Sequence, residues 1–290
     1  MGIQKRLSAG EFVVIAEMNT PKGVDISRFV TAAQRIRGRV DAVSVPGMEN
    51  GVMRMSALAG GALMQQQGLE ALIHVYTRDR NRLALQGDLL AAHVLGLQNL
   101  VVVNSEEMDQ GDHRDAKPVN DVDELELTRA IASLQAGKDM AGFDLDGAPQ
   151  FFAGCALGRF TDDAGLDREV KAAAARVDAG AKFVIAPAVF DADKAAPMLD
   201  KLAELKVPVI PTVFLVKSVA VARYISTNEP QAGITEALIK RIRKAADREQ
   251  ECLKIAGETV AALKERTQGV LIQTLGWEHR LPAVLDAAGL

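Results

Sequence analysis

Short apolar runs alternate with longer amphipathic segments along the whole chain. Eight runs, most of them rich in Val, Ile and Phe, follow Gly or polar residues, which is typical of strands buried on both faces of a parallel sheet. The segments between them carry Ala, Leu, Arg and Glu at helical spacing. The predicted strands are Phe12–Glu17, Val40–Val45, Ala71–Tyr76, Asn99–Asn104, Gln150–Ala156, Lys182–Pro187, Val207–Val213 and Gly269–Gln273.

Eight strand–helix units in 290 residues are what a parallel (β/α)8 barrel requires, so we predict an α/β fold of the TIM-barrel type. No linker rich in Pro, Ser or Gly divides the chain, and we therefore expect one domain spanning residues 1–290. The longest irregular stretch, 105–121, interrupts the alternation once. Because such barrels place their chemistry at the C-terminal ends of the strands, the search for function narrows to eight short stretches.

Composition narrows the class of protein further. The net charge is −4 with acidic and basic residues intermixed, which does not favour binding to nucleic acid or to an anionic membrane. No apolar run reaches about 18 residues and the N-terminal segment lacks the apolar stretch of a signal peptide, so we expect a cytoplasmic protein. The 2 cysteines and 4 histidines lack the spacing of metal ligands, and we expect no metal.

Glu17 and His74 are the first candidates for catalysis. Glu17 ends the first apolar run, where a carboxylate is either a catalytic group or the cap of the following loop. Burial beside apolar neighbours would raise its pKa towards neutrality, as suits a general acid. His74 interrupts the third run, and Tyr76 shares its face at a period of two. A single histidine in a strand is usually a core residue, but this shared face favours a site.

Several polar segments have both a structural and a functional interpretation. The arginine-rich segment 78–82 can be a capped helix start with Asp79 as the N-cap, or a binding site for phosphate or carboxylate. Asp121 or Asp123 is expected to cap a helix over Leu125–Leu134. Small residues at 153–158 would let a flat ring or a phosphate approach the backbone. Trp277, the only tryptophan, could stack on a ligand ring or plug the barrel mouth.

Five segments, in this order, resemble methylenetetrahydrofolate reductases, and more closely their short bacterial forms without a regulatory domain. Together they span nearly all of the chain. The resemblance implies a flavin-dependent (β/α)8 barrel of one-carbon metabolism and methionine biosynthesis. The segments are RDRNRLALQGDLLAAHVLGLQNL (78–100), GDHRDAKPVNDVD (111–123), VDAGAKFVIAPAVFD (177–191), VPVIPTVFLVKS (207–218) and GVLIQTLGWE (269–278).

The resemblance also implies an activity and residue roles. The reaction is the reduction of 5,10-methylenetetrahydrofolate to 5-methyltetrahydrofolate, or its reverse, with FAD rather than FMN as the flavin. Glu17 matches a general acid that acts on the folate, and Glu106 matches an acid near the flavin and the pterin. Matched or neighbouring positions for the cofactor are His74, Tyr76, Asn104, Ser105, Lys117, Cys155, Leu157, Glu169 and Arg176. For the substrate they are Pro187, Phe214, Lys217 and Trp277.

The chain departs from the family pattern at the predicted mouth of the barrel. Glu106 stands where Asp is usual and Ser105 where Gly is usual, and Tyr76-Thr77 replaces Thr-Cys. Pro187 replaces a Gln that touches both folate and nicotinamide, which removes a two-sided hydrogen-bonding group. Flavin binding is therefore better supported than direct use of NAD(P)H, and a partner redox subunit could supply the electrons instead.

Two other interpretations remain open. A catalytically altered paralogue could keep the barrel and act as a folate- or flavin-binding subunit of a larger redox complex. A corrinoid or pterin methyltransferase barrel fits the fold but not the motifs, and the sequence has no evident cluster of metal ligands for it. The amphipathic helices could also form a homo-oligomer interface.

Overall fold

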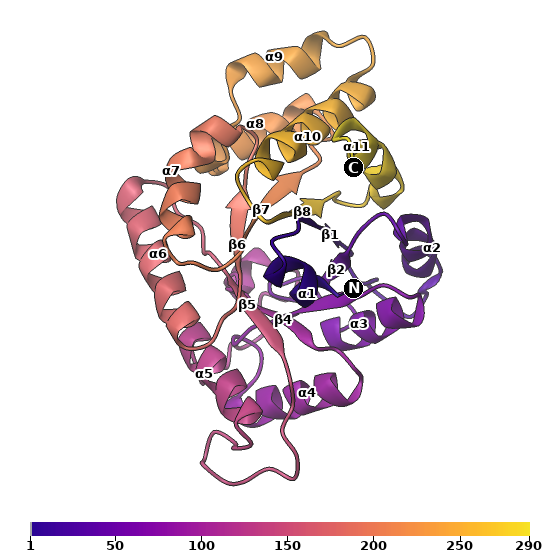
Figure 1. The fold of residues 1–290 in the computed structure, drawn as a ribbon. Helices are drawn as coiled ribbons and strands as arrows, with labels where there is room; N and C mark the ends of the chain where they lie inside the picture. Colours follow the sequence, from indigo (N-terminus) through magenta and orange to yellow (C-terminus); the bar gives the residue numbers. More distant parts are fainter. Residues whose placement is uncertain (1) are drawn as a thin grey trace.

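The computed structural model describes residues 2–290, and its eight parallel strands close into a barrel in sequence order (Figure 1). This confirms the predicted (β/α)8 TIM barrel, and every strand lies within two residues of its predicted ends. The strands are β1 Val13–Glu17, β2 Ala42–Val45, β3 Ala71–Val75, β4 Asn99–Val102, β5 Phe152–Ala156, β6 Val184–Ala188, β7 Val209–Phe214 and β8 Gly269–Gln273.

Helices surround the barrel, and three of them follow β7 where the simple alternation needs one (Figure 1). Separate N-caps begin the second and third, since Thr235 and Asp247 accept hydrogen bonds from Leu238 N and Gln250 N. The helices are α1 Ile3–Ser8, α2 Ser27–Ile36, α3 Ala57–Gln66, α4 Arg82–Val94, α5 Glu124–Gln135, α6 Asp163–Asp178, α7 Ala192–Ala203, α8 Val219–Asn228, α9 Glu236–Lys244, α10 Arg248–Lys264 and α11 Leu281–Ala287.

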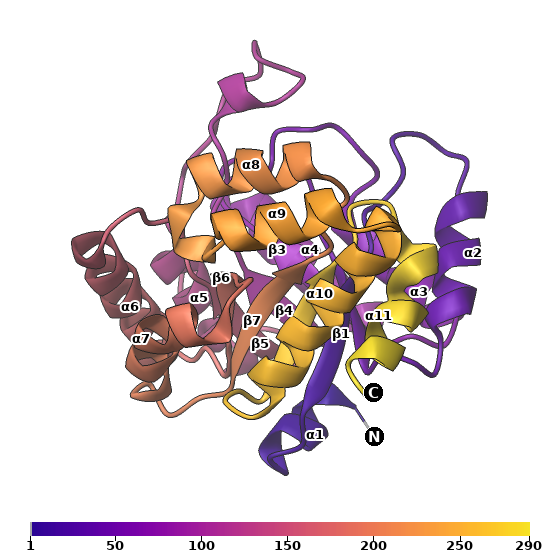
Figure 2. The ribbon, with the colours of Figure 1, turned by 90° about the horizontal axis from the view of Figure 1, so that it is seen from above.

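Strand alternation divides the core into two layers. One set of side chains fills the barrel interior and the other packs under the helices. Inside, the rings of Phe152 and Phe183 stack with centroids 5.1 Å apart. Ile3 and Leu7 of α1 join this inner cluster from the N-terminal end of the barrel (Figure 2). None of the helices in residues 2–290 is long and apolar enough to cross a membrane.

The structure also tests the predicted helix caps. Asp123 caps α5 and forms a capping box with Glu126, as predicted for one of two aspartates. The N-cap of α4 is Asn81, so the prediction for Asp79 was wrong. The irregular stretch 105–121 contains only the short 3-10 helix Met108–Gln110 and projects from the rim of the barrel (Figure 2).

We expect Gly154→Ala to lower the free energy of unfolding by about 1–3 kcal/mol, because overpacking a filled core forces its neighbours to move. An added Cβ would lie 2.4 Å from Phe183 Cε2. The matched control is Gly87→Ala in α4, where a Cβ meets open space and helix propensity improves, so stability should rise by up to about 1 kcal/mol. Urea denaturation of both variants measures this, and equal effects would contradict the packing described here.

Candidate active site

Four polar side chains point into the barrel near the C-terminal ends of four neighbouring strands. In the order β8, β1, β2 and β3, they are Gln273, Glu17, Ser44 and His74. Each is an even number of residues from an inward apolar residue of its own strand, which is why all four share the interior. Glu17 and His74, the first candidates for catalysis in the sequence, thus lie in one polar rim.

Glu17 is the most enclosed acid of this rim, with only 8% of its surface exposed. Its Oε2 accepts a hydrogen bond from Gln273 Nε2, and its Oε1 accepts one from Asn19 Nδ2 at 3.1 Å. Burial raises the pKa of Glu17, and the charge on His74 and the bond from Gln273 only partly offset this effect. Glu17 therefore holds its proton at a higher pH than an ordinary glutamate, which is the electrostatic requirement of a general acid.

His74 is held on both ring nitrogens. Nδ1 lies 2.8 Å from Glu49 Oε1, and Nε2 lies 2.7 Å from Ser44 Oγ. Burial by itself would lower the pKa of His74, but attraction to the Glu49 carboxylate outweighs it and raises the pKa. For Glu49 the same attraction outweighs burial, and its pKa is lowered. The imidazole is therefore stabilised as a cation.

The sequence analysis missed Glu49. It lies in the irregular segment between β2 and α3, where no periodicity indicates the direction of a side chain. Its only signal was a carboxylate in a loop that follows a barrel strand. The contact with His74 joins residues 25 positions apart and depends on the pairing of β2 with β3.

Arg78 is a structural clamp and not a free anion site. It is 4% exposed, forms an ion pair with Asp79 at 2.7 Å, and donates to the carbonyl oxygens of Met48, Glu49 and Glu106. One guanidinium thereby joins the loops that follow β2, β3 and β4. The other predicted anion binders, Arg80 and Arg82, are also paired within the chain, with Asp88 and Asp121.

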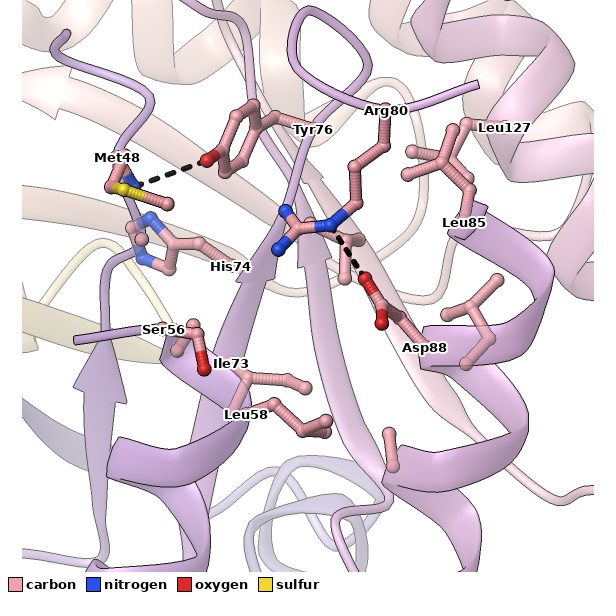
Figure 3. Close-up of a pocket in the computed structure, with 15 residues that line it drawn as sticks. Met48, Ser56, Leu58, Ile73, His74, Tyr76, Arg80, Leu85, Asp88 and Leu127 are labelled. Carbon is pink, nitrogen blue, oxygen red and sulfur yellow. Dashed lines mark hydrogen bonds and ion pairs between the residues drawn. The ribbon is translucent and has the colours of Figure 1, made fainter. Parts of the chain in front are cut away.

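Tyr76 packs into the inner cluster and lines a pocket together with His74 (Figure 3). Its hydroxyl donates to Asp79 Oδ2 at 2.8 Å and accepts from Met48 N at 3.3 Å. Burial raises the pKa of Tyr76, so the phenol stays neutral. Both hydrogen-bonding functions of the hydroxyl are thus occupied within the chain.

The segment after β4 makes internal contacts through Glu106 and has one buried side-chain atom without a partner. The Glu106 carboxylate pairs with Arg159 Nη2 at 2.8 Å, and its backbone N donates to Glu49 O at 2.8 Å. Ser105 Oγ is buried with no hydrogen-bond partner among residues 2–290. Asn104 is exposed, and so is Lys117 further along the same loop.

A cavity of about 220 Å³ opens at this end of the barrel, and we call it the mouth cavity. Apolar and small side chains of β5 to β7 form part of its wall. Its lining includes His74, Leu157, Gly158, Pro187, Phe214, Gln231 and Gln273. The predictions for Leu157, Pro187 and Phe214 thus concern residues that lie together at one cavity.

Lys217 and Trp277 lie beside each other in the loops after β7 and β8. Lys217 Nζ is 5.3 Å from the centroid of the Trp277 ring and donates to Leu275 O. Burial lowers the pKa of Lys217, partly offset by Glu278. Neither Lys217 nor Trp277 is among the residues that line the mouth cavity.

Two predicted cofactor contacts require correction. Cys155 is fully buried in the layer between β5 and the helices, because it points away from the barrel interior. Arg176 is 3% exposed, lies near the C-terminal end of α6 and donates to Ala172 O. Glu169 alone reaches the rim, where its Oε2 accepts from Gly158 N at 2.7 Å.

Within residues 2–290, no group of three or more His, Cys, Asp or Glu side chains is arranged to hold a metal ion. Cys155 and Cys252 are both buried and free. The carboxyl, imidazole, hydroxyl and amide groups of the rim can transfer protons and orient a bound molecule.

Comparisons with known proteins agree with this architecture. A family model described as methylenetetrahydrofolate reductase matches residues 2–289. The chain is similar to the EDTA monooxygenase EmoA from Chelativorans sp. BNC1 at 12% identity, covering 96% of this chain and 94% of that one, with a TM-score of 0.54. No curated protein matches the sequence.

A second similar structure is an F420-dependent secondary alcohol dehydrogenase in complex with an F420-acetone adduct. Identity is again 12%, with 94% of this chain and 99% of that chain covered and a TM-score of 0.59. At this identity both structures support the barrel fold alone.

We expect Arg78→Lys to loosen the rim, because a single ammonium cannot replace a planar fork that reaches three carbonyls and a carboxylate. Hydrogen exchange at the amides of Gly51 and Glu106, which bond to Met48 O and Glu49 O, should quicken at least tenfold, or about 1.4 kcal/mol. Arg82→Lys is the control, since its pair with Asp121 is exposed. Equal exchange in both variants would show that Arg78 is not a clamp.

Proposed function

Because the chain belongs to the methylenetetrahydrofolate reductase family, we propose that it is a flavin-dependent oxidoreductase acting on the one-carbon unit of a folate. The reaction is the interconversion of 5,10-methylenetetrahydrofolate and 5-methyltetrahydrofolate. The observation that carries the proposal is the buried Glu17, whose pKa is raised beside a cationic imidazole at the rim. This is the acid that opening a folate ring requires.

The residues around the mouth cavity fit a flavin. A Cβ added to Gly158 would lie 2.7 Å from Glu169 Oε2 and 2.8 Å from Asn104 Nδ2, so a side chain at this position would displace these two groups. The unpartnered Ser105 Oγ can bond a polar ring edge, and Leu157 supplies an apolar wall. When bound, a flavin supplies the hydride that reduces the one-carbon unit. FAD rather than FMN is the flavin we propose.

Glu17 acts on the substrate. It protonates a nitrogen of the five-membered ring that carries the one-carbon unit, and the ring opens to an electrophilic iminium. Gln273 and Asn19 each donate to one of its oxygens, so the carboxyl group is fixed in orientation before the substrate arrives. Burial also excludes the water that would otherwise bring the pKa of Glu17 back to its ordinary value.

Glu106 balances positive charge that develops on the pterin. In the free protein Arg159 occupies this carboxylate, but both side chains are partly or largely exposed, and an exposed ion pair is worth little. A pterin can therefore compete for the carboxylate at small cost. Phe214 and Pro187, which line the mouth cavity, offer apolar surface to the folate, and Lys217 and Trp277 lie at the next loops.

The choice of electron donor depends on Pro187, which stands where the family pattern has a glutamine. With no amide at this position, the hydrogen bonds to nicotinamide weaken, and a partner redox subunit becomes a competent alternative to NAD(P)H.

If the protein is instead a non-catalytic subunit, replacing Glu17 leaves the activity of the parent complex unchanged.

The proposal predicts flavin in the gently purified protein, seen as visible absorbance and identified by mass spectrometry. Addition of NADH and of NADPH in separate anaerobic trials identifies the electron donor by bleaching. Bleaching by methyltetrahydrofolate tests the folate reaction without any nicotinamide. Protein that neither carries nor rebinds FAD or FMN would refute the proposed function.

We expect Glu17→Gln to slow the folate reaction at least about a hundredfold, since a general acid contributes about that much or more. The wild-type rate should be flat at low pH and fall once the pH exceeds the raised pKa of Glu17, because only the protonated acid works. The variant should lose this fall. Glu204→Gln, an exposed glutamate at the end of α7, is the control and should match wild type in rate and pH profile.

A further inference from the structure

One buried carboxylate of the rim has no part in the proposed function. Glu49 Oε1 accepts from His74 Nδ1 at 2.8 Å, and Glu49 Oε2 accepts from Gly47 N at 2.8 Å. The side chains of Glu49 and His74 are 15% and 10% exposed. Because burying a charge is costly unless it is paired and hydrogen-bonded, this arrangement stabilises Glu49 as a carboxylate and His74 as an imidazolium together.

The same imidazole continues towards the predicted acid. His74 Nε2 lies 2.7 Å from Ser44 Oγ, and Ser44 is the residue paired with Glu17 in the register of β1 and β2. Paired residues of adjacent strands point to the same face. Glu49, His74 and Ser44 are therefore joined by hydrogen bonds, and Ser44 lies opposite Glu17 on the same face of the neighbouring strand.

We propose that Glu49 is a positioning residue that holds His74 protonated, so that His74 and Ser44 return a proton to Glu17 after each turnover; this rests on the proposed function. The His74 Nε2–H bond breaks as its proton passes to Ser44 Oγ, while the Ser44 hydroxyl proton passes to the Glu17 carboxylate. His74 is left neutral with Nδ1–H still on Glu49. A solvent proton arriving through the mouth cavity, which His74 lines, restores the imidazolium.

The Ser44–His74–Glu49 connectivity resembles a hydrolytic triad, in which a serine is the nucleophile. Ser44 is 0% exposed and lies within strand β2, so no substrate reaches its oxygen. A hydroxyl that can donate and accept at once but meets no substrate is suited to passing a proton.

The charges around His74 favour the cation. Glu49 faces it from the loop after β2 and Glu17 faces it from β1. On the side of α4, the groups that line its pocket are already partnered within the chain (Figure 3). These are Tyr76, bonded to Asp79, and Arg80, paired with Asp88.

The test reads the charge of His74 directly, by the nitrogen-15 chemical shifts of the 4 histidines over a pH titration of the full-length protein. In wild type, the His74 ring should stay doubly protonated above the pH at which an exposed histidine titrates. In Glu49→Gln, its titration should move down by about one pH unit or more. Asp112→Asn is the matched control, since Asp112 pairs with the exposed His113 at 2.7 Å and should leave His74 unchanged.

Ser44→Ala separates the relay from the charge, and covers the case in which Glu49→Gln does not fold. This variant should leave His74 protonated but slow the folate reaction under multiple turnover. The solvent isotope effect on the turnover rate, measured in heavy water, should disappear. A neutral His74 in wild type, or wild-type turnover in Ser44→Ala, would overturn the inference. Absence of flavin would refute the proposed function only, because the titration of His74 can still be measured in flavin-free protein.

Discussion

The pairing of the first strand with the last is the constraint on which the site depends. Strand β8 lies against β1, and this closure brings Gln273 into contact with Glu17 across 256 positions of sequence. It also seals the barrel interior against water, and burial is the largest influence on the pKa of Glu17. In an open sheet the same glutamate would be solvated and ordinary. Closure therefore produces both the location and the acidity of the candidate catalytic group.

A second constraint acts on the loops. The rim is built from irregular segments whose carbonyl groups need donors, and Arg78 supplies several of them from a single buried side chain. Its own charge is balanced by Asp79. In the sequence, a cluster of arginines beside a strand end is equally compatible with phosphate binding. The difference is decided by burial, because a guanidinium whose donors are all occupied internally has nothing left for a ligand.

Two of the positions that depart from the pattern implied by the resemblance, Glu106 and Pro187, lie at the outer part of the mouth. Glu106 meets Arg159, and Pro187 lines the cavity without an amide. The inner site also carries Glu49, a carboxylate that the sequence motifs do not reveal, which contacts Nδ1 of His74. The inner site is thus organised by charge pairing around one imidazole.

The sequence by itself determined the barrel and placed Glu17 and His74 near the C-terminal ends of their strands, because a period of two and eight apolar runs are local properties of the chain. It could not determine which loop side chains meet those residues. Glu49 was missed, and Cys155 and Arg176 were predicted as cofactor contacts although both are buried and neither lines the mouth cavity. Each error concerns a property that the local sequence pattern does not give. These properties are the side of the strand that Cys155 faces, the position of Arg176 along its helix, and the residues that Glu49 contacts. Only the closed tertiary structure decides these, since burial and pairing arise when distant segments pack together.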